Sequence, residues 1–236
     1  MEQEKRTRRK RTWIIGIAAV SALVLIGITA GSFLLFLSQA NEVVAGVCFM
    51  RGYRYMTGVG TTQDKAKGIG YYRRAAARGH AQAQRELGMC LLFGDGVKTD
   101  EVEGFFWICK SAEQNDPVAL CDLGMCYSEG KGVKQDKAEA VKWFRKSAEL
   151  GCTEGMCNLG SCYFSGEGVP MDDAEALKWF RNAADQDDTN GMTKVGVCYM
   201  LGKGVPKDEE MSVRWFRRAA ALGNPLAQES LRRLGY

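Results

Sequence analysis

Histidine and proline are scarce in this sequence: its 236 residues include one histidine, His80, and four prolines. One imidazole cannot build the histidine clusters of most catalytic zinc sites, and no Cys-x-x-Cys pair is present to supply thiolate ligands instead. A cysteine hydrolase would have a single candidate base. The sequence therefore predicts no catalytic residue, no metal and no cofactor, and hence a protein that is not an enzyme.

An excess of charge is also missing outside the N-terminal segment. The chain has 32 basic and 28 acidic residues, a formal net charge of +4. Six of the basic residues and two of the acidic ones precede residue 41, so the other 196 residues carry 26 of each sign. A balanced surface creates no extended positive field, which argues against nucleic acid as a partner.

A long uncharged run lies near the N-terminus. Residues 13–37 read WIIGIAAVSALVLIGITAGSFLLFL, and as a helix they would be about 37 Å long, enough to cross a bilayer core of roughly 30 Å. They predict a transmembrane helix in contact with the lipid bilayer. The basic residues of segment 1–12 predict a cytoplasmic tail and an exported remainder, which in a bacterium would face the periplasm from the inner membrane. Gly27 and Gly31 form a GxxxG pattern through which two copies could pack as a homodimer.

A cleavable signal peptide is the alternative to this anchor. Ser38-Gln39-Ala40 offers small residues for cleavage after Ala40, which would release a secreted protein. An apolar run of 25 residues exceeds the roughly 7–15 of a signal-peptide core, which favours the anchor. Residues 38–44 would then form a short linker that holds the exported part close to the membrane.

A repeat of 36 residues occupies the rest of the chain. Two glycine series with this spacing recur in five copies without a gap, together with one aspartate and one aromatic position. A single unit of this size cannot bury its apolar face alone, so the copies are expected to stack into a solenoid. The units are residues 45–80, 81–116, 117–152, 153–188 and 189–224, with a capping helix expected over 225–236.

The fourth unit shows why each copy is expected to be a helix-turn-helix. Its apolar residues recur at steps of three and four, which predicts helices over about 153–164 and 173–184. Gly166 and Gly168 supply the turn, Asp172 caps the second helix, and Trp179 is expected in the core. The fold class is therefore an all-α solenoid preceded by one transmembrane helix.

The motif LGSCYFSGEGVPMDDAEALKWFRNAA, residues 159–184, resembles the Sel1-like repeat, a relative of the tetratricopeptide repeat. The resemblance covers about residues 45–236. It implies a right-handed superhelix whose concave face, lined mainly by the first helix of each unit, binds a peptide or another protein, and a repeat that is not catalytic. The function it implies here is a membrane-anchored interaction scaffold; a secreted effector or a cysteine-dependent hydrolase remains the alternative.

Specificity is expected at first-helix positions that differ between copies, although solvated surface positions also vary without any function. Two such rows are the candidate partner-binding residues. The first row is Glu86, Asp122, Asn158 and Lys194, and the second is Leu92, Ser128, Phe164 and Met200.

The positions of the nine cysteines are explained by the repeat rather than by a catalytic or metal-binding motif. Several occupy the same position in successive copies, as Cys126 and Cys162 do, which favours core packing between helices. Equivalent positions on neighbouring helices are expected to lie about 8–10 Å apart, too far for a disulfide. Cys109 and Cys121 lie at equal distances on either side of the turn near Asn115, so they are the candidate disulfide.

Overall fold

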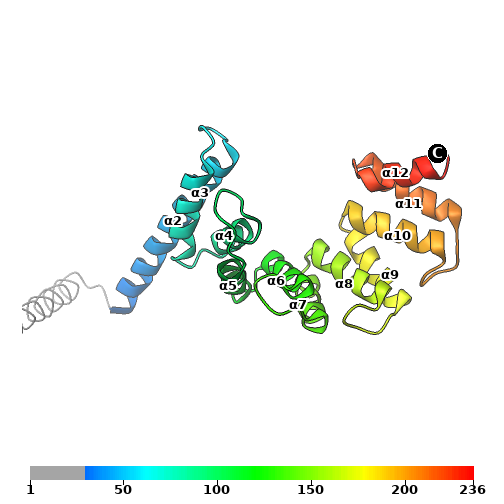
Figure 1. Ribbon diagram of the computed structural model, residues 1–236, viewed down its shortest axis with the longest axis horizontal. Helices are drawn as coiled ribbons and strands as arrows, with labels where there is room; N and C mark the ends of the chain where they lie inside the picture. Colours follow the sequence, from blue (N-terminus) through cyan, green and yellow to red (C-terminus); the bar gives the residue numbers. More distant parts are fainter. Residues whose placement is uncertain (1–29) are drawn as a thin grey trace, which may run out of the picture.

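The computed structural model describes residues 30–236, and every regular element in that range is an α-helix. Successive hairpins follow one another along a curved rod, with α2 at one end and α12 at the other (Figure 1). The helices are α2 (Ala30–Thr57), α3 (Lys65–Ala76), α4 (Ala81–Phe93), α5 (Glu101–Ala112), α6 (Pro117–Glu129), α7 (Lys137–Glu149), α8 (Thr153–Ser165), α9 (Asp173–Ala184), α10 (Thr189–Leu201), α11 (Glu209–Ala221) and α12 (Pro225–Arg233).

The predicted all-α solenoid is confirmed. Helices α2, α4, α6, α8 and α10 are the first helices of the five units, and α3, α5, α7, α9 and α11 are the second. In the fourth unit, α8 begins at Thr153 and α9 spans Asp173–Ala184, as the apolar spacing predicted. Helix α12 occupies the place of the closing helix expected over residues 225–236.

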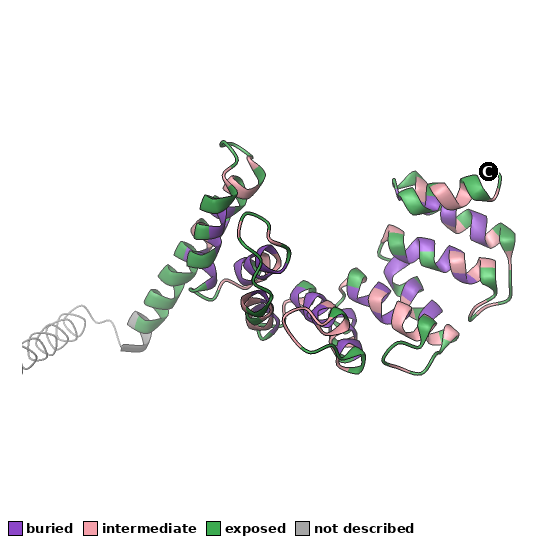
Figure 2. Cartoon of the chain, in the orientation of Figure 1, coloured by how far each residue is buried: buried purple, intermediate pink, exposed green. Residues whose placement is uncertain are grey.

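The N-terminal part of α2 stands apart from the stack, and its side chains are exposed from Leu34 onward (Figure 2). Residues 38–44, expected to be a linker, belong to this helix, because no glycine or proline interrupts the chain between Gly31 and Gly46. Residues 13–29 of the predicted span and Gly27 of the GxxxG pattern lie outside the described residues. Within residues 30–236, no helix is both long and apolar enough to cross a membrane.

The second helix of each unit begins at an aspartate that caps it. Asp172 Oδ1 accepts a hydrogen bond of 2.9 Å from the Glu175 backbone N–H at the start of α9, and its counterparts in the other units cap in the same way. Gly166 ends α8 in the left-handed conformation, with φ 73°. The caps therefore fix the hairpin boundaries that the sequence predicted.

The two helices of a hairpin pack glycine against a large side chain. A Cβ placed on Gly160 would lie 2.6 Å from Cε1 of Phe180, so only glycine lets α8 approach α9 this closely. Phe180 is buried in the C-terminal core cluster. Trp179, expected in the core, is half-buried at its edge, where its indole N–H donates a 3.0 Å hydrogen bond to Glu175. The polar edge of the ring explains this position, since it needs a hydrogen-bond acceptor.

The turn of each hairpin contacts the preceding hairpin. Gly168 has φ 72°, and a Cβ there would overlap the backbone of Lys137 at the start of α7. Lys137 also pairs with Glu167 in the same turn, at 2.9 Å. Neighbouring units are thus held at a fixed spacing, and this stacking sets the shape of the surface that the first helices share.

Candidate binding groove

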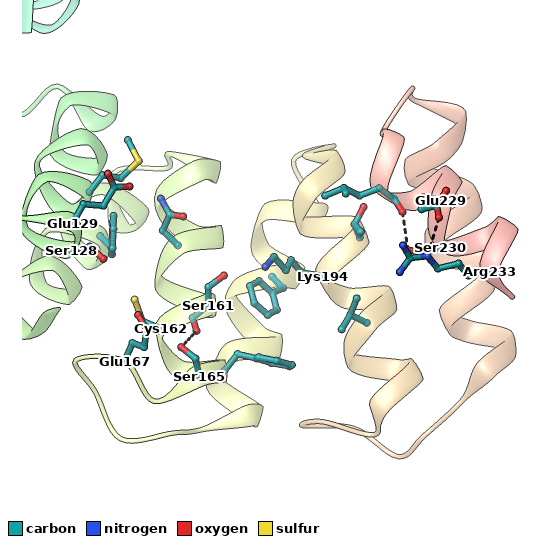
Figure 3. Close-up of a pocket in the computed structure, with 18 residues that line it drawn as sticks. Ser128, Glu129, Ser161, Cys162, Ser165, Glu167, Lys194, Glu229, Ser230 and Arg233 are labelled. Carbon is teal, nitrogen blue, oxygen red and sulfur yellow. Dashed lines mark hydrogen bonds and ion pairs between the residues drawn. The ribbon is translucent and has the colours of Figure 1, made fainter. Parts of the chain in front are cut away.

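The first helices of the C-terminal units enclose a groove. Its main cavity of about 660 Å³ lies between α6, α8, α10 and α12, with side chains from all four converging on it (Figure 3). It is lined by Met125, Ser128, Glu129, Phe144, Asn158, Ser161, Cys162, Phe164, Ser165, Glu167, Phe180, Thr193, Lys194, Val197, Leu226, Glu229, Ser230 and Arg233.

A second hollow extends this groove along the same helices. It has a volume of about 540 Å³ and reaches Thr153, Glu154 and Asp188 near the N-terminal ends of α8 and α10. The residues common to both hollows are Asn158, Ser161, Thr193, Lys194 and Leu226. The two hollows therefore form one continuous surface along α8, α10 and α12, of the kind on which a segment of another chain can lie.

The floor of the groove is apolar. Phe164 and Val197 are half-buried in the C-terminal core cluster, and Phe164 packs against Phe180 with their ring centres 6.4 Å apart. Leu226 on α12 is 64% exposed, although it faces the same groove. An exposed large side chain beside a half-buried apolar floor is the arrangement expected of a protein-contact surface.

The charges along the groove differ in how far they are neutralised. Glu129, Glu167 and Glu229 each form an ion pair with a nearby basic residue, at 2.7 to 2.9 Å. Lys194 is exposed, its Nζ lies 5.9 Å from the centre of the Phe180 ring, and it has no ion-pair partner among the residues that the structure describes. The free positive group of the groove is therefore Lys194.

The first predicted row is divided by the structure. Asn158 and Lys194 line the groove, whereas Glu86 is half-buried beside Arg85. Asp122 is only 3% exposed, with its carboxylate 3.4 Å from the Arg85 guanidinium, so it is not available to a partner. Burial raises the pKa of Asp122 to about 6, against the opposing effect of Arg85.

The second row is divided in the same way. Ser128 and Phe164 line the groove, while Met200 is half-buried against the C-terminal core and does not. Leu92 is 5% exposed and fills the space left by Gly104, where a Cβ would lie 2.8 Å from its Cγ. Leu92 and Asp122 are therefore buried in this structure, although they share a register with exposed positions of other units.

Most residues of the groove were missed from the sequence, among them Leu226 and Arg233 of α12, a helix that was expected only to cap the solenoid. Leu226 did offer a signal, because it follows Pro225 in the first turn of the helix and does not belong to the core-facing stripe that Ala227 represents. An apolar residue on a capping face therefore marks a possible contact site.

The candidate disulfide is not formed, since all nine cysteines are free thiols. Cys109 packs against the cluster that contains Cys126, whereas Cys121 is buried in the cluster of the following units. Equal distance from a turn did not bring Cys109 and Cys121 together, because each helix turns only one stripe toward its neighbour.

Comparison with known proteins agrees with this architecture. A Sel1 repeat protein from Oxalobacter formigenes is similar to this chain, at 28% identity and TM-score 0.74, over 91% of this chain and 80% of that one. A protective antigen of uropathogenic Escherichia coli with an SLR fold is 38% identical, with TM-score 0.72, over 83% of this chain. This chain spans only 42% of that antigen.

More distant structures share the fold alone. An immunity protein from Pseudomonas aeruginosa is 19% identical, with TM-score 0.56, over 78% of this chain and 67% of its own. No curated protein matches the chain. The sequence model of the Sel1 repeat matches residues 46–80, 81–116, 117–152, 153–188 and 189–224, which are the hairpins described above. The chain therefore belongs to the Sel1 repeat family.

Proposed function

We propose that this protein is a membrane-anchored scaffold that binds a segment of another protein in the groove formed by α6, α8, α10 and α12. The observation that carries the proposal is the continuous pair of hollows along these four helices, with an apolar floor and an unpaired lysine. A rigid stack that presents one long surface suits binding better than chemistry.

The charges of the groove indicate what kind of segment fits. The acidic side chains of the main cavity, Glu129, Glu167 and Glu229, are already paired, so a basic segment there would have to displace existing partners. Lys194 is free to pair with a carboxylate, and Phe164 and Leu226 can cover apolar side chains on either side of it. The segment that the groove suits is therefore apolar with an acidic residue near its middle.

The anchor rests on the apolar run at residues 13–37 and on the basic residues before it. Leu34, Leu35 and Phe36, which belong to that run, are each more than 60% exposed in α2. The Escherichia coli relative is a protective antigen, a role that would suit an exported location for these repeats also.

A site-specific crosslinking experiment tests the groove. A photoreactive residue at Ser161, in the shared part of the two hollows, should capture a partner in cells, whereas the same residue at exposed Lys98 should not. Lys194→Glu should reduce the capture at least several-fold, while the matched charge change Lys98→Glu should leave it unchanged. Equal capture in both variants would remove the groove from the proposal.

Analysis of the mature protein tests the anchor separately. An intact N-terminal segment in the membrane fraction is expected. A mature chain that begins at Asn41 would instead show cleavage after Ala40 and release, and would contradict the anchored form without affecting the groove.

A further inference from the structure

The residue at the start of α8 departs from the pattern of the other first helices. Asp116, Asp188 and Asn224 each accept a hydrogen bond from a backbone N–H of the helix they cap, at 2.8, 2.7 and 3.0 Å. The residue in the same position of α8 is Cys152, which makes no capping hydrogen bond of normal geometry. Capping therefore does not explain a thiol in this position.

Cys152 lies against a second thiol. Cys121 of α6 is fully buried in the hydrophobic cluster against which Cys152 packs. The equivalent positions one unit later hold Cys157 and Asp188, whose Sγ and Oδ1 atoms are 3.5 Å apart. The repeat thus brings these two positions into side-chain contact in both units, and in one of them both side chains are cysteine.

The two thiols are not chemically equivalent. Cys152 is half-exposed, whereas Cys121 is fully buried. The neighbouring Cys121 thiol lowers the pKa of Cys152, and the same contact together with burial raises the pKa of Cys121. Cys152 is therefore the thiol that a dissolved reagent reaches first, and Cys121 is the second thiol beside it.

We propose that Cys152 and Cys121 are a redox site at which a small-molecule disulfide, such as oxidised glutathione, introduces a bond that fastens α6 to the start of α8. The Cys152 thiolate attacks one sulfur of the reagent and releases one glutathione thiolate. Cys121 then attacks the Cys152 sulfur of the mixed disulfide, gives up its proton to solvent, and releases the second glutathione thiolate. Two protein thiols are oxidised and one reagent disulfide is reduced to two thiolates.

The bond would act directly beneath the groove. Asn158 Nδ2 donates a 3.2 Å hydrogen bond to Cys121 Sγ, and Asn158 lines both hollows. Oxidation would convert the Cys121 thiol, which accepts the hydrogen bond from the Asn158 amide, into a disulfide sulfur. The same bond would tie α6 to the start of α8. The site therefore couples the redox state of the surroundings to the position of a groove side chain, whichever partner the groove binds.

Peptide mapping of the full-length protein, purified in detergent and incubated with oxidised glutathione, tests the bond. After alkylation of the remaining thiols, cleavage before Asp and after Glu yields DPVALC (116–121) and LGCTE (150–154), each with one cysteine. The expected product is these two peptides joined by a disulfide, which disappears on reduction. A thermal unfolding midpoint higher by roughly 5–10 °C in the oxidised protein should accompany it.

Single substitutions supply the controls. Cys152→Ser and Cys121→Ser should both abolish the linked product, while Cys162→Ser, a half-buried thiol on the same helix, should keep it. In the untreated, unmutated protein, the pH dependence of the iodoacetamide labelling rate should give Cys152 an apparent pKa well below that of Cys162.

Two results would overturn the proposal. One is slow labelling of Cys152 with no linked peptides in the unmutated protein, a result that does not depend on any variant folding. The other is the linkage of DPVALC to GFFWICKSAE (104–113), which would assign Cys121 to Cys109. Neither result bears on crosslinking in the groove, so failure here is distinguishable from failure of the proposed function.

Discussion

At the scale of single residues, the turn between successive hairpins depends on a left-handed backbone. Gly151 has φ 89°, and a Cβ added to it would meet nothing within 4 Å. We expect Gly151→Ala to lower the free energy of unfolding by about 1 kcal/mol, because the loss comes from backbone conformation with no steric contribution. Thermal and urea unfolding of the purified protein would measure it.

Gly70 provides the matched control for this substitution. It lies in α3, its Cβ would also meet nothing within 4 Å, and its backbone is helical. Gly70→Ala is therefore expected to raise stability by about 0.5–1 kcal/mol through helix propensity. Equal effects of the two substitutions would mean that the turn conformation is not what Gly151 supplies.

Asp122 gives a prediction about pH. Its folded pKa of about 6 lies above the ordinary value of 3.8, so its ionised form destabilises the fold, and this penalty decreases as the pH falls through 6 toward 4. Asp122→Asn has no such penalty. The difference in free energy of unfolding between the variant and the unmutated protein should thus decrease by about 1 kcal/mol from pH 7.5 to pH 5, as measured by urea unfolding. A constant difference across this range would show that Asp122 ionises normally.

At the scale of helices, the start of α8 can be improved. Cys152→Asp would give α8 the kind of cap that Asp188 provides to α10. The Asp188 carboxylate is already accommodated beside Cys157, the counterpart of Cys121. We expect a gain of about 1 kcal/mol in unfolding free energy under reducing conditions. Cys152→Ala is the control, which removes the thiol without adding a cap and should show no gain. A destabilised Asp variant would mean that the site does not accept a carboxylate.

The helices were the part of the fold that the sequence could predict. Caps, turn glycines and apolar spacing are local, so α8 and α9 could be placed within a residue or so. The exposure of side chains was harder, because it depends on how hairpins stack. Leu92 and Phe164 share a register, yet Leu92 is buried over Gly104 while Phe164 lines the groove. The packing of Cys152 against the cluster that holds Cys121 depends on how the start of α8 folds back onto α6, which helix periodicity alone does not reveal.

At the scale of the whole molecule, each hairpin is stabilised chiefly by its neighbours, and the last one depends on α12. Ala227 of this helix is fully buried in the C-terminal core cluster with Phe216 and Val195. Its neighbour Leu226 is 64% exposed and faces the groove. One short helix therefore closes the core with one side and completes the binding surface with the other.

Two adjacent substitutions should separate these roles. Ala227→Asp places an unpaired carboxylate in the core, at a cost of several kcal/mol, and should detach α12 so that backbone amides of α10 and α11 exchange much faster with deuterium. Leu226→Asp adds the same group to the exposed side, so protection should stay near that of the unmutated protein while crosslinking at Ser161 falls.

Since units far from the end contact only their own neighbours, α4 and α5 should keep their protection in both variants. Loss of protection in α4 and α5 with Ala227→Asp would instead show that the stack unfolds as one cooperative unit, and equal loss in α10 and α11 with Leu226→Asp would contradict the separation of the two sides of α12.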